Sequence, residues 1–421
     1  MGKLRRLYRL VRRNWNLICA SLALIVSMTL GVTSGHWMFY RAGYVMAGLI
    51  AVSYVWARTN LRGLEVTVGR LGDRFQVGQR AEARVRLMSS SFFPKLWIEI
   101  EDQTDMPAKA PRTVVSMRSG GTIFWDAATE CNRRGLFHTG PITITTGDPF
   151  GLFRFRRQHG EPHSLLVYPS PEELPYFSVP PAQLSGGSNI RQQTNNLTSN
   201  AAGVREYMPG DEFNRIHWRT TARVGRPMVK TFDIDPSSQI WLVLDMDGTV
   251  HAGSEDESTE EYAVRAASSI GYHFLQTDRP LGFLASGKQL AIIPPGRGAL
   301  QYDQIQENLA LAKSDGAASL AGLLAHEAAR FNKHSTLIVI TPSHKEDWVG
   351  MVQDLAHRGA RLVVVLLDAA SFGAREGALL PYSALTAGDI MTYLVRRGDD
   401  LSLALGPLGA SGEAVHEAGP A

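Results

Sequence analysis

The chain has 421 residues, of which 44% are apolar and 20% charged, and its 43 basic and 40 acidic side chains leave a formal charge of +3. This length allows two or three domains, each with a core of its own, and charges so near balance argue against a nucleic-acid-binding protein. The two cysteines, Cys19 and Cys131, argue against a disulfide framework and offer no zinc-binding spacing.

The start of the chain predicts a membrane anchor. Residues 1–15 form a basic segment with six Lys or Arg and no acid, and two apolar runs follow within residues 16–57. Each run is close to the ~20 residues that cross a bilayer. The positive-inside rule therefore predicts two transmembrane helices in the inner or plasma membrane, with the bulk of the chain in the cytosol. A cleaved signal peptide is the alternative for the first run.

Residues 60–168 are predicted to form an antiparallel β-sandwich, because eight short runs alternate apolar and polar residues between turn signals. The sequence DPFGLF at residues 148–153 is typical of a tight turn that enters a strand. Residues 169–202 are rich in Pro, Ser, Asn and Gly, which indicates a linker or a mobile loop.

Residues 203–236 combine many charges with aromatic residues. Asp211 follows Pro-Gly and is a suitable N-cap, so residues 211–223 are predicted to form a short helix that Gly225 closes. Three arginines recur at every fourth position of this helix and make one cationic stripe, namely Arg215, Arg219 and Arg223. The stripe is either a salt-bridged connector between domains or a docking surface for an anion or a partner protein.

Residues 237–403 are predicted to form an α/β domain. Unbroken apolar runs such as QIWLVLD at residues 239–245 are typical of buried parallel strands, and helical patterns separate them, one of which opens with a capping box at Ser258 and Glu261. This alternation predicts an open, mostly parallel Rossmann-type sheet that helices cover on both faces. Residues 404–421 are predicted to be a frayed tail.

Together these features resemble the bacterial family called domain of unknown function 58. The resemblance covers nearly all of the chain, from the two apolar runs through an Arg133-Arg134-Gly135 turn and the DPFGLF motif to a long signature, G-x-R-x-Y-x-x-G-D-x-x-x-x-I-x-W-x-x-x-A-R. The signature positions in this sequence are Gly203, Arg205, Tyr207, Gly210, Asp211, Ile216, Trp218, Ala222 and Arg223.

The resemblance implies a von Willebrand factor A-like C-terminal domain and an association with MoxR-type AAA+ ATPases and transglutaminase-like membrane proteins, but no established activity. We therefore expect a membrane-anchored adaptor or chaperone-like partner of such an ATPase, neither an enzyme nor a nucleic-acid-binding protein. The residues expected to bind the partner are Arg205, Tyr207, Gly210, Asp211, Arg215, Ile216, Trp218, Arg219 and Arg223.

The first buried strand of the α/β domain ends in the acidic sequence DMDGT. Von Willebrand A domains hold Mg²⁺ there with a D-x-S-x-S sequence, and Asp245 and Thr249 match its first and last positions whereas Asp247 replaces a serine. Pro342-Ser343 stands where a further Asp ligand is expected, and residues 316–319 replace the usual Gly-Thr turn. We therefore expect a degenerate magnesium site, with Mg²⁺-dependent adhesion as an alternative function.

The DMDGT sequence also resembles the first motif of haloacid-dehalogenase-type, Mg²⁺-dependent phosphatases, in which the first Asp is the nucleophile and the second is the general acid/base. Thr341 and Asp399-Asp400 would supply the second and fourth motifs, but Lys345 follows Thr341 too closely to be a third-motif lysine. This phosphatase is the second alternative to an adaptor. The sequence contains no P-loop, which excludes ATP hydrolysis by that route.

Overall fold

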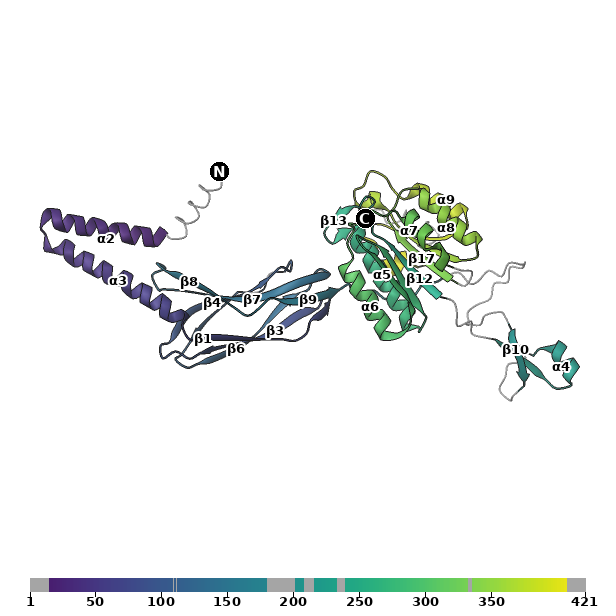
Figure 1. Cartoon of the computed structure of the whole chain (residues 1–421), viewed down its shortest axis with the longest axis horizontal. Coiled ribbons are helices and arrows are strands. Elements are labelled where there is room, and N and C mark those ends of the chain that lie inside the picture. Colours follow the sequence, from purple (N-terminus) through teal and green to yellow (C-terminus); the bar gives the residue numbers. More distant parts are fainter. Residues whose placement is uncertain are drawn as a thin grey trace, which may run out of the picture. The chain divides into compact units, whose positions relative to one another are not determined.

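The structure is a computed structural model, and it describes residues 15–108, 110, 112–179, 201–207, 216–232, 239–331 and 335–406. The chain divides into two compact units, Met1–Pro169 and Ser170–Ala421. The first unit opens with an apolar helix pair, and the body that follows is a mixture of helices and several β-sheets (Figure 1).

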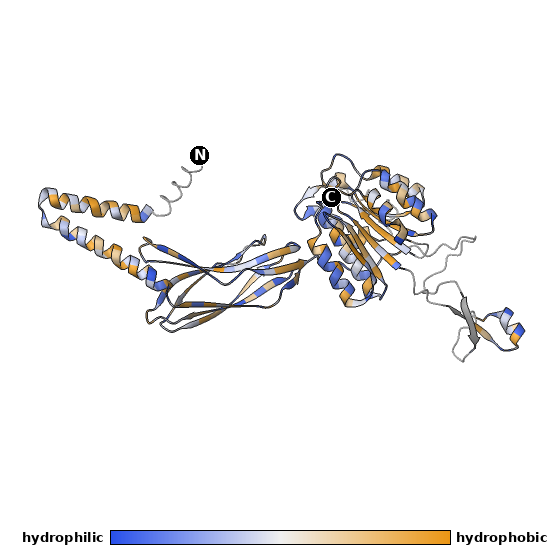
Figure 2. Ribbon diagram, in the orientation of Figure 1, coloured by the Kyte–Doolittle hydropathy of each residue, from blue (hydrophilic) through white to orange (hydrophobic). Residues whose placement is uncertain are grey.

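The two N-terminal helices are α2 (Trp15–Ser34) and α3 (Trp37–Leu61), and both are long and apolar enough to cross a membrane. Their ribbons are largely hydrophobic in Figure 2, yet only 6% and 11% of their most apolar stretches are buried. A core helix of a soluble protein would bury its apolar side chains, so these helices need another apolar environment. Two helices are present as predicted, and α3 continues four residues past the predicted end at residue 57.

Two sheets make up the rest of the first unit. One is antiparallel in the order β1-β3-β6, and the other has the order β2-β9-β7-β4-β5 with β8 also paired to β7. The strands are β1 (Leu64–Arg70), β2 (Arg74–Gln76), β3 (Arg80–Ser89), β4 (Lys95–Thr104), β5 (Thr113–Met117), β6 (Thr122–Glu130), β7 (Gly135–Gly147), β8 (Arg154–His159) and β9 (His163–Tyr168). Val85 and Leu87 of the first sheet share a buried core with Ile98, Ile100 and Ile144 of the second. All eight predicted strands are present, and only the three-residue β2 was missed.

A buried lysine joins α3 to the β-sheets. The Lys95 side chain is fully buried at the start of β4, and its ammonium group donates to the backbone carbonyls of Thr59 and Arg62 at the end of α3. The amide of Asn60 in α3 also bonds Leu96 and the Thr146 hydroxyl, each at 2.6 Å. A cation at a helix C-terminus satisfies carbonyls that have no partner within the helix. The last turn of α3 is therefore fixed to β4 and β7.

The second unit contains a six-stranded sheet in the order β16-β15-β12-β17-β18-β19, parallel except for β16 at one edge. Its strands are β12 (Gln239–Asp245), β15 (Leu281–Ser286), β16 (Leu290–Gly296), β17 (Ser335–Thr341), β18 (Arg361–Leu367) and β19 (Met391–Val395), and a two-stranded hairpin, β13 (Gly253–Ser254) and β14 (Glu257–Ser258), precedes the first helix. Strand β12 pairs with both β15 and β17, so it lies in the centre of the sheet.

Helices cover both faces of this sheet. Leu242 and Leu244 of β12 pack into the core beneath α5 (Thr259–Gln276), α6 (Gly298–Leu311) and α10 (Leu401–Ala404). Trp241 and Val243 point to the opposite core, which α7 (Leu320–Glu327), α8 (Asp347–His357) and α9 (Leu379–Ala387) cover. The predicted capping box is present at the start of α5, where the Ser258 hydroxyl accepts the N–H of Glu261.

The predicted end of the second unit was wrong. Leu405 is fully buried in the core with Leu401, so the folded part extends to Gly406 and the tail does not begin at residue 404. Residues 407–421 lie outside the described part of the chain. The sequence also did not predict helix α9, helix α10, the hairpin of β13 and β14, or the short 3₁₀ turn η3 (Ala369–Phe372).

The lysine cap generates the first prediction. Lys95→Met should lower the free energy of unfolding of the first unit by about 2 kcal/mol or more, because two helix-end carbonyls lose their buried donor. Urea unfolding of the full chain in detergent, followed by tryptophan fluorescence, measures the change. Arg74→Met removes an exposed cation of the same unit and should change stability by less than about 0.5 kcal/mol. Equal effects of the two substitutions would contradict the structural role of Lys95.

Candidate functional site

The carboxylate of Asp245 lies buried at the carboxyl end of the central strand β12, with 1% of the residue exposed. Oδ2 accepts the Thr341 hydroxyl from β17 at 2.7 Å, and Oδ1 accepts the N–H of Asp247 at 3.1 Å and the Ser286 hydroxyl from β15 at 3.4 Å. Burial raises the pKa of Asp245, and the hydrogen bonds from Thr341 and Asp247 only partly oppose this rise. Both carboxylate oxygens are thus engaged by neighbouring groups of the sheet.

Asp247 is held by a hydroxyl and an ammonium group. Its Oδ1 accepts the N–H and the hydroxyl of Thr249, both at 2.9 Å, and its Oδ2 lies 3.6 Å from Nζ of Lys345. The same ammonium group donates to the Thr249 hydroxyl at 3.1 Å. Burial alone would raise the pKa of Asp247, but the Thr249 bonds and the Lys345 charge outweigh it and hold this pKa below its ordinary value. Asp247 is therefore an ionised carboxylate paired with a lysine.

The loop after β12 is fixed to the loop between α6 and α7. Gly248 donates its N–H to the carbonyl of Gly316, and Gly316 donates to Met246 at 3.1 Å. A side chain on either glycine would lie within 2.8 Å of backbone oxygens, which only glycine avoids. The neighbouring Ser314 donates its N–H and hydroxyl to Glu260 of α5 at 2.9 and 2.6 Å. The acidic loop is a rigid, closely packed structure.

Two polar residues of this site were missed in the sequence. The Ser286 hydroxyl contacts Asp245 and accepts the N–H of Met246 at 3.0 Å. His251 lies over the same strand end, where Nε2 donates to the Asp245 carbonyl at 2.9 Å and Nδ1 lies 3.0 Å from the Thr259 hydroxyl. Burial lowers the pKa of His251, so the imidazole is neutral near pH 7. Ser286 ends the parallel strand next to β12, and this position could have indicated that its hydroxyl would lie beside Asp245. The sequence spacing of His251 gave no sign that its imidazole would contact the same strand end.

The donor set at the acidic loop does not fit a resident divalent cation. Mg²⁺ needs about six oxygen ligands that are free to bind it, but both oxygens of Asp245 already accept hydrogen bonds within the protein. The ammonium of Lys345 lies beside Asp247 and Thr249, where it would repel a cation. Among the described residues no group of three or more His, Cys, Asp or Glu side chains could hold a metal ion. Lysine supplies the positive charge at this loop.

Lys345 lies at the acidic loop, although it follows Thr341 too closely to match the third phosphatase motif. The segment after β17 turns back and brings Lys345 to Asp247. Thr341 itself contacts Asp245 as the phosphatase reading requires. Asp399 and Asp400 make local bonds instead, since Asp399 accepts the N–H of Arg396 and Asp400 caps α10.

The signature segment forms a small hairpin with a helix. Strands β10 (Ala201–Glu206) and β11 (Met228–Phe232) pair antiparallel, and α4 (Trp218–Val224) lies between them in the sequence. His217 caps the helix start by accepting the N–H of Thr220 at 3.2 Å, and Gly225 closes it in the left-handed conformation at φ 74°. The Thr221 hydroxyl accepts the N–H of Met228, which ties the helix to β11.

The predicted start of the signature helix was wrong. Ile216 forms a β-bridge with Val229, so the helix begins at Trp218 and not at residue 211. Ile216 is 6% exposed and anchors the hairpin, whereas Trp218 is 68% exposed and both Arg219 and Arg223 are exposed on α4. For Arg205 the structure describes only the backbone. Gly210, Asp211 and Arg215 lie outside the described residues. Tyr207 continues the hairpin by donating its N–H to Pro227 at 2.9 Å.

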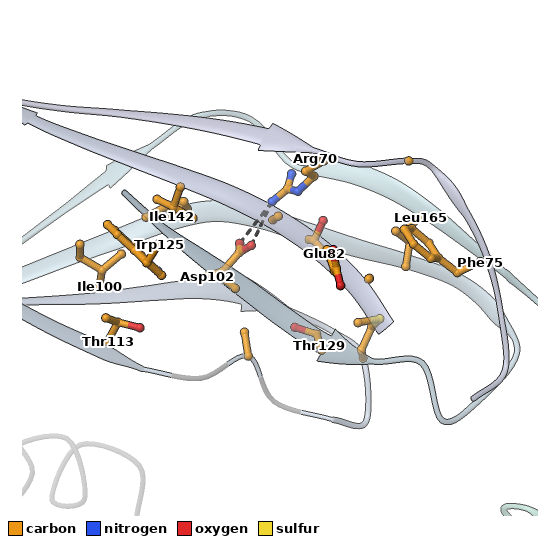
Figure 3. Close-up of a pocket in the computed structure, with 18 residues that line it drawn as sticks. Arg70, Phe75, Glu82, Ile100, Asp102, Thr113, Trp125, Thr129, Ile142 and Leu165 are labelled. Atoms are coloured by element: carbon orange, nitrogen blue, oxygen red, sulfur yellow. Dashed lines mark hydrogen bonds and ion pairs between the residues drawn. The ribbon is translucent and has the colours of Figure 1, made fainter. Parts of the chain in front are cut away.

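The first unit contains one further hollow, a cavity of about 40 Å³ between its sheets. Figure 3 shows the ion pair of Arg70 and Asp102 at this cavity, with Trp125 and Ile142 among the apolar lining; the pair has a separation of 3.2 Å. A water molecule needs roughly 10–15 Å³ of such space, so the cavity holds a few waters at most. It is too small for a substrate.

The signature segment and the acidic loop both lie in the part of the chain that matches a family model. Residues 203–372 match the family described as "Protein of unknown function DUF58". The resemblance noted in the sequence is thereby supported for this part of the chain, which holds the α4 hairpin and the acidic loop.

Three similar proteins have descriptions that state no activity. The uncharacterised protein YeaD of Bacillus subtilis is 24% identical over 365 residues, which cover 84% of this chain and 88% of that protein. An uncharacterised protein of Mycobacterium tuberculosis is 33% identical over 95 residues, 22% of this chain and 30% of the relative. The crystal structure of "conserved hypothetical protein BatB from Bacteroides thetaiotaomicron" is 15% identical, covers 40% of this chain and 94% of that chain, and has a TM-score of 0.31. A likeness at that TM-score carries no argument about fold or function.

The lysine at the acidic loop generates the second prediction. Mn²⁺ should leave the thermal midpoint of the wild-type chain unchanged, because the ammonium of Lys345 repels the ion. Lys345→Ala frees the Asp247 carboxylate, so Mn²⁺ should raise the midpoint of this variant by about 2–4 °C per kcal/mol of binding energy. Thermal unfolding of the full chain in detergent with and without Mn²⁺ measures both. Lys288→Ala, at an exposed lysine of the same unit, should behave as the wild type, and an equal shift in all three proteins would contradict the role of Lys345.

Proposed function

We propose that this protein is a membrane-anchored adaptor whose α4 hairpin docks a partner protein. The observation that carries the proposal is the surface of α4, where Trp218 is 68% exposed beside the exposed Arg219 and Arg223. Tryptophan, tyrosine and arginine are the residues most enriched at the energetic centres of protein interfaces, and α4 exposes one tryptophan next to two arginines.

The acidic loop supports a binding role more than a chemical one. A nucleophilic or metal-ligating carboxylate needs an accessible oxygen, but Asp245 is 1% exposed and both of its oxygens accept hydrogen bonds. Asp247 is paired with Lys345. The loop thus holds one ammonium and one carboxylate in a fixed arrangement. It lies at the carboxyl ends of the parallel strands, where α/β proteins bind their ligands.

For the second unit we propose a von Willebrand A-like domain, and for the partner a MoxR-type AAA+ ATPase, with a transglutaminase-like membrane protein as a further associate. The sheet order with one antiparallel edge strand, β16, supports the domain proposal. Support for the ATPase comes from the family resemblance of the signature between Gly203 and Arg223. Because the acidic loop does not fit Mg²⁺, we propose binding that needs no metal, in place of Mg²⁺-dependent adhesion.

The proposed location is the inner or plasma membrane, with α2 and α3 crossing it and the bulk of the chain in the cytosol. The lengths and exposed apolar surfaces of the two helices support this proposal. Arg58 and Arg62 at the end of α3 lie on the same side as residues 1–15 in a two-helix hairpin, as the positive-inside rule requires.

The adaptor proposal predicts a loss of affinity when the indole is removed. Trp218→Ala should weaken binding of the purified full chain to a purified MoxR-type ATPase from the same organism by about 30-fold or more, the effect of losing an interface anchor worth about 2 kcal/mol. Biolayer interferometry measures the affinity. Leu380→Ala, which removes an exposed apolar side chain from α9, serves as the control and should leave binding unchanged. Wild-type protein that fails to bind the ATPase would refute the choice of partner.

A phosphatase is the second candidate, and a specific observation favours it. Thr341 and Lys345 gather around Asp245 and Asp247, which is the set of residue types such an enzyme uses. The burial of Asp245 and its raised pKa count against it, because the nucleophile must be ionised and reachable. We therefore rank it below the adaptor.

The adaptor ranking predicts no phosphatase activity. The purified full chain in detergent should release no phosphate from a generic phosphoester with or without Mg²⁺. Turnover that disappears in Asp245→Asn would reverse the ranking. Asp278→Asn, at an exposed carboxylate of the same unit, is the matched control for that substitution.

A further inference from the structure

The end of the β-sheets next to α3 carries an aromatic rim, which we define as Phe92, Phe93, Trp97 and Phe150. Phe92 is 86% exposed, Trp97 67% and Phe150 57%. Four large apolar rings in water at one end of a folded unit are costly, since burying each would gain about 1.5–3 kcal/mol. Such a group of exposed apolar side chains marks a contact surface.

The rim residues lie on segments that are bonded to the ends of the two apolar helices. The loop of Phe92 and Phe93 is tied to the helix end by a bond from the Ser90 N–H to the Gly63 carbonyl at 2.8 Å and by the Lys95 cap. The loop of Phe150 is tied to the helices at a second point, where the side-chain amide of Asn16 at the start of α2 donates to the Gly151 carbonyl. Both loops therefore stay next to the ends of the apolar helices.

A third contact brings the DPFGLF turn against α3 itself. The ring of Tyr54 packs edge-on against Phe153 and Phe155, with centroids 5.4 and 6.0 Å apart. Asp148 shapes the turn by accepting the N–H groups of Phe150 and Phe153 at 2.9 and 2.6 Å. With those bonds made, Phe153 faces the helix and the Phe150 ring is left exposed.

A strained bulge turns the rim outward on β4. The pairing of β4 with β5 shifts register between Lys95 and Ile98, and Trp97 within this bulge has a φ of 55°. A left-handed conformation is unfavourable for a bulky residue and persists where the structure uses it. As a result Leu96 and Trp97 are both exposed, whereas regular alternation would turn one of them inward.

The length of α3 sets the position of this rim relative to a bilayer. Its 25 residues span about 37 Å, whereas the hydrocarbon core of a bilayer is about 30 Å thick. About five residues of the helix therefore extend beyond the core, and the loops that contact residues 58–63 lie at the level of the lipid headgroups. The four segments that meet there, residues 58–63, 90–97, 116–121 and 147–154, contain five Lys or Arg and one acid.

We infer that the aromatic rim is inserted in the headgroup layer of a membrane with anionic lipids, so that the β-sheets lie on the bilayer and are not merely tethered to it. Aromatic side chains favour this layer because it is apolar on one side and wet on the other. The exposed cations Arg58, Arg62, Arg118 and Arg154 attract anionic headgroups. This inference rests on the membrane anchor proposed above, and its test separates the two.

The test places one fluorescent label at a time on the full chain in vesicles of phosphatidylcholine and phosphatidylglycerol. Cys19→Ser removes the exposed thiol, and Cys131 is buried; the chain without an added cysteine gives the labelling background. An environment-sensitive dye is attached at Phe92→Cys in the rim, at Val45→Cys in the middle of α3, and at Leu71→Cys. Leu71 is as exposed as the rim residues but lies at the far end of β1, about 23 Å away at 3.3 Å per residue.

Lipids with a spin label near the headgroup should quench the dye at position 92 by about twofold, since interfacial side chains lie about 5–10 Å deep. Lipids with a spin label deep in the acyl chain should quench the dye at position 45 by a similar factor, and neither lipid should affect position 71. Quenching at position 45 without quenching at position 92 would refute the insertion of the aromatic rim and would leave the proposed membrane anchor standing. Quenching at none of the three positions overturns the anchor, and the rim with it. Phe93→Ser and Trp97→Ala together should reduce the quenching at position 92, whereas Phe124→Ser, at an exposed ring on β6, should not.

Discussion

The ammonium of Lys95, buried against the last carbonyls of α3, is the interaction on which the first unit depends. A helix end carries partial negative charge and carbonyl groups without partners, and a β-strand can satisfy them only by bringing a donor to that point. Lysine at the first position of β4 does so, and Asn60 adds bonds to β4 and β7. The helix and the sheets are therefore one body, so any orientation imposed on α3 is passed on to the strands.

Most of the fold could be predicted from hydropathy because burial dictates it. Strands such as β12 and β17 have an unbroken apolar centre and are buried at nearly every position, since both of their faces lie beneath helices. Hydropathy does not indicate which elements pair with one another. The direction of β16 and the start of α4 at Trp218 were not indicated, because a tertiary pairing of Ile216 with Val229 prevails over local capping signals. Helix α9 was missed because Pro381 and its small residues give no apolar period.

In the candidate site, too, some residues could be predicted from the sequence and others could not. Spacing alone placed Asp245, Asp247 and Thr249 on one loop, and the strand ending at Thr341 indicated that its hydroxyl would join them. Lys345 was discounted as a third-motif lysine because only three residues separate it from Thr341, yet the loop turns back and places its ammonium group beside Asp247. Distance along a sequence is a poor guide wherever a loop reverses. The sequence therefore indicated the pattern of a metal site, but it did not indicate that the ammonium group of Lys345 would occupy the place of the cation.

The central position of β12 determines when the second unit can be completed. Its neighbour β17 pairs Ser335 with Gln239, and almost a hundred residues lie between these two positions. The central strand pair of the sheet therefore cannot form until this intervening segment has left the ribosome. The helix pair and the β-sheets of the first unit, which end at Tyr168, need nothing beyond that point. Synthesis from the N-terminus thus delivers α2 and α3 first. Under the membrane anchor proposed above, the α/β unit would reach its native state only after these helices had entered the bilayer.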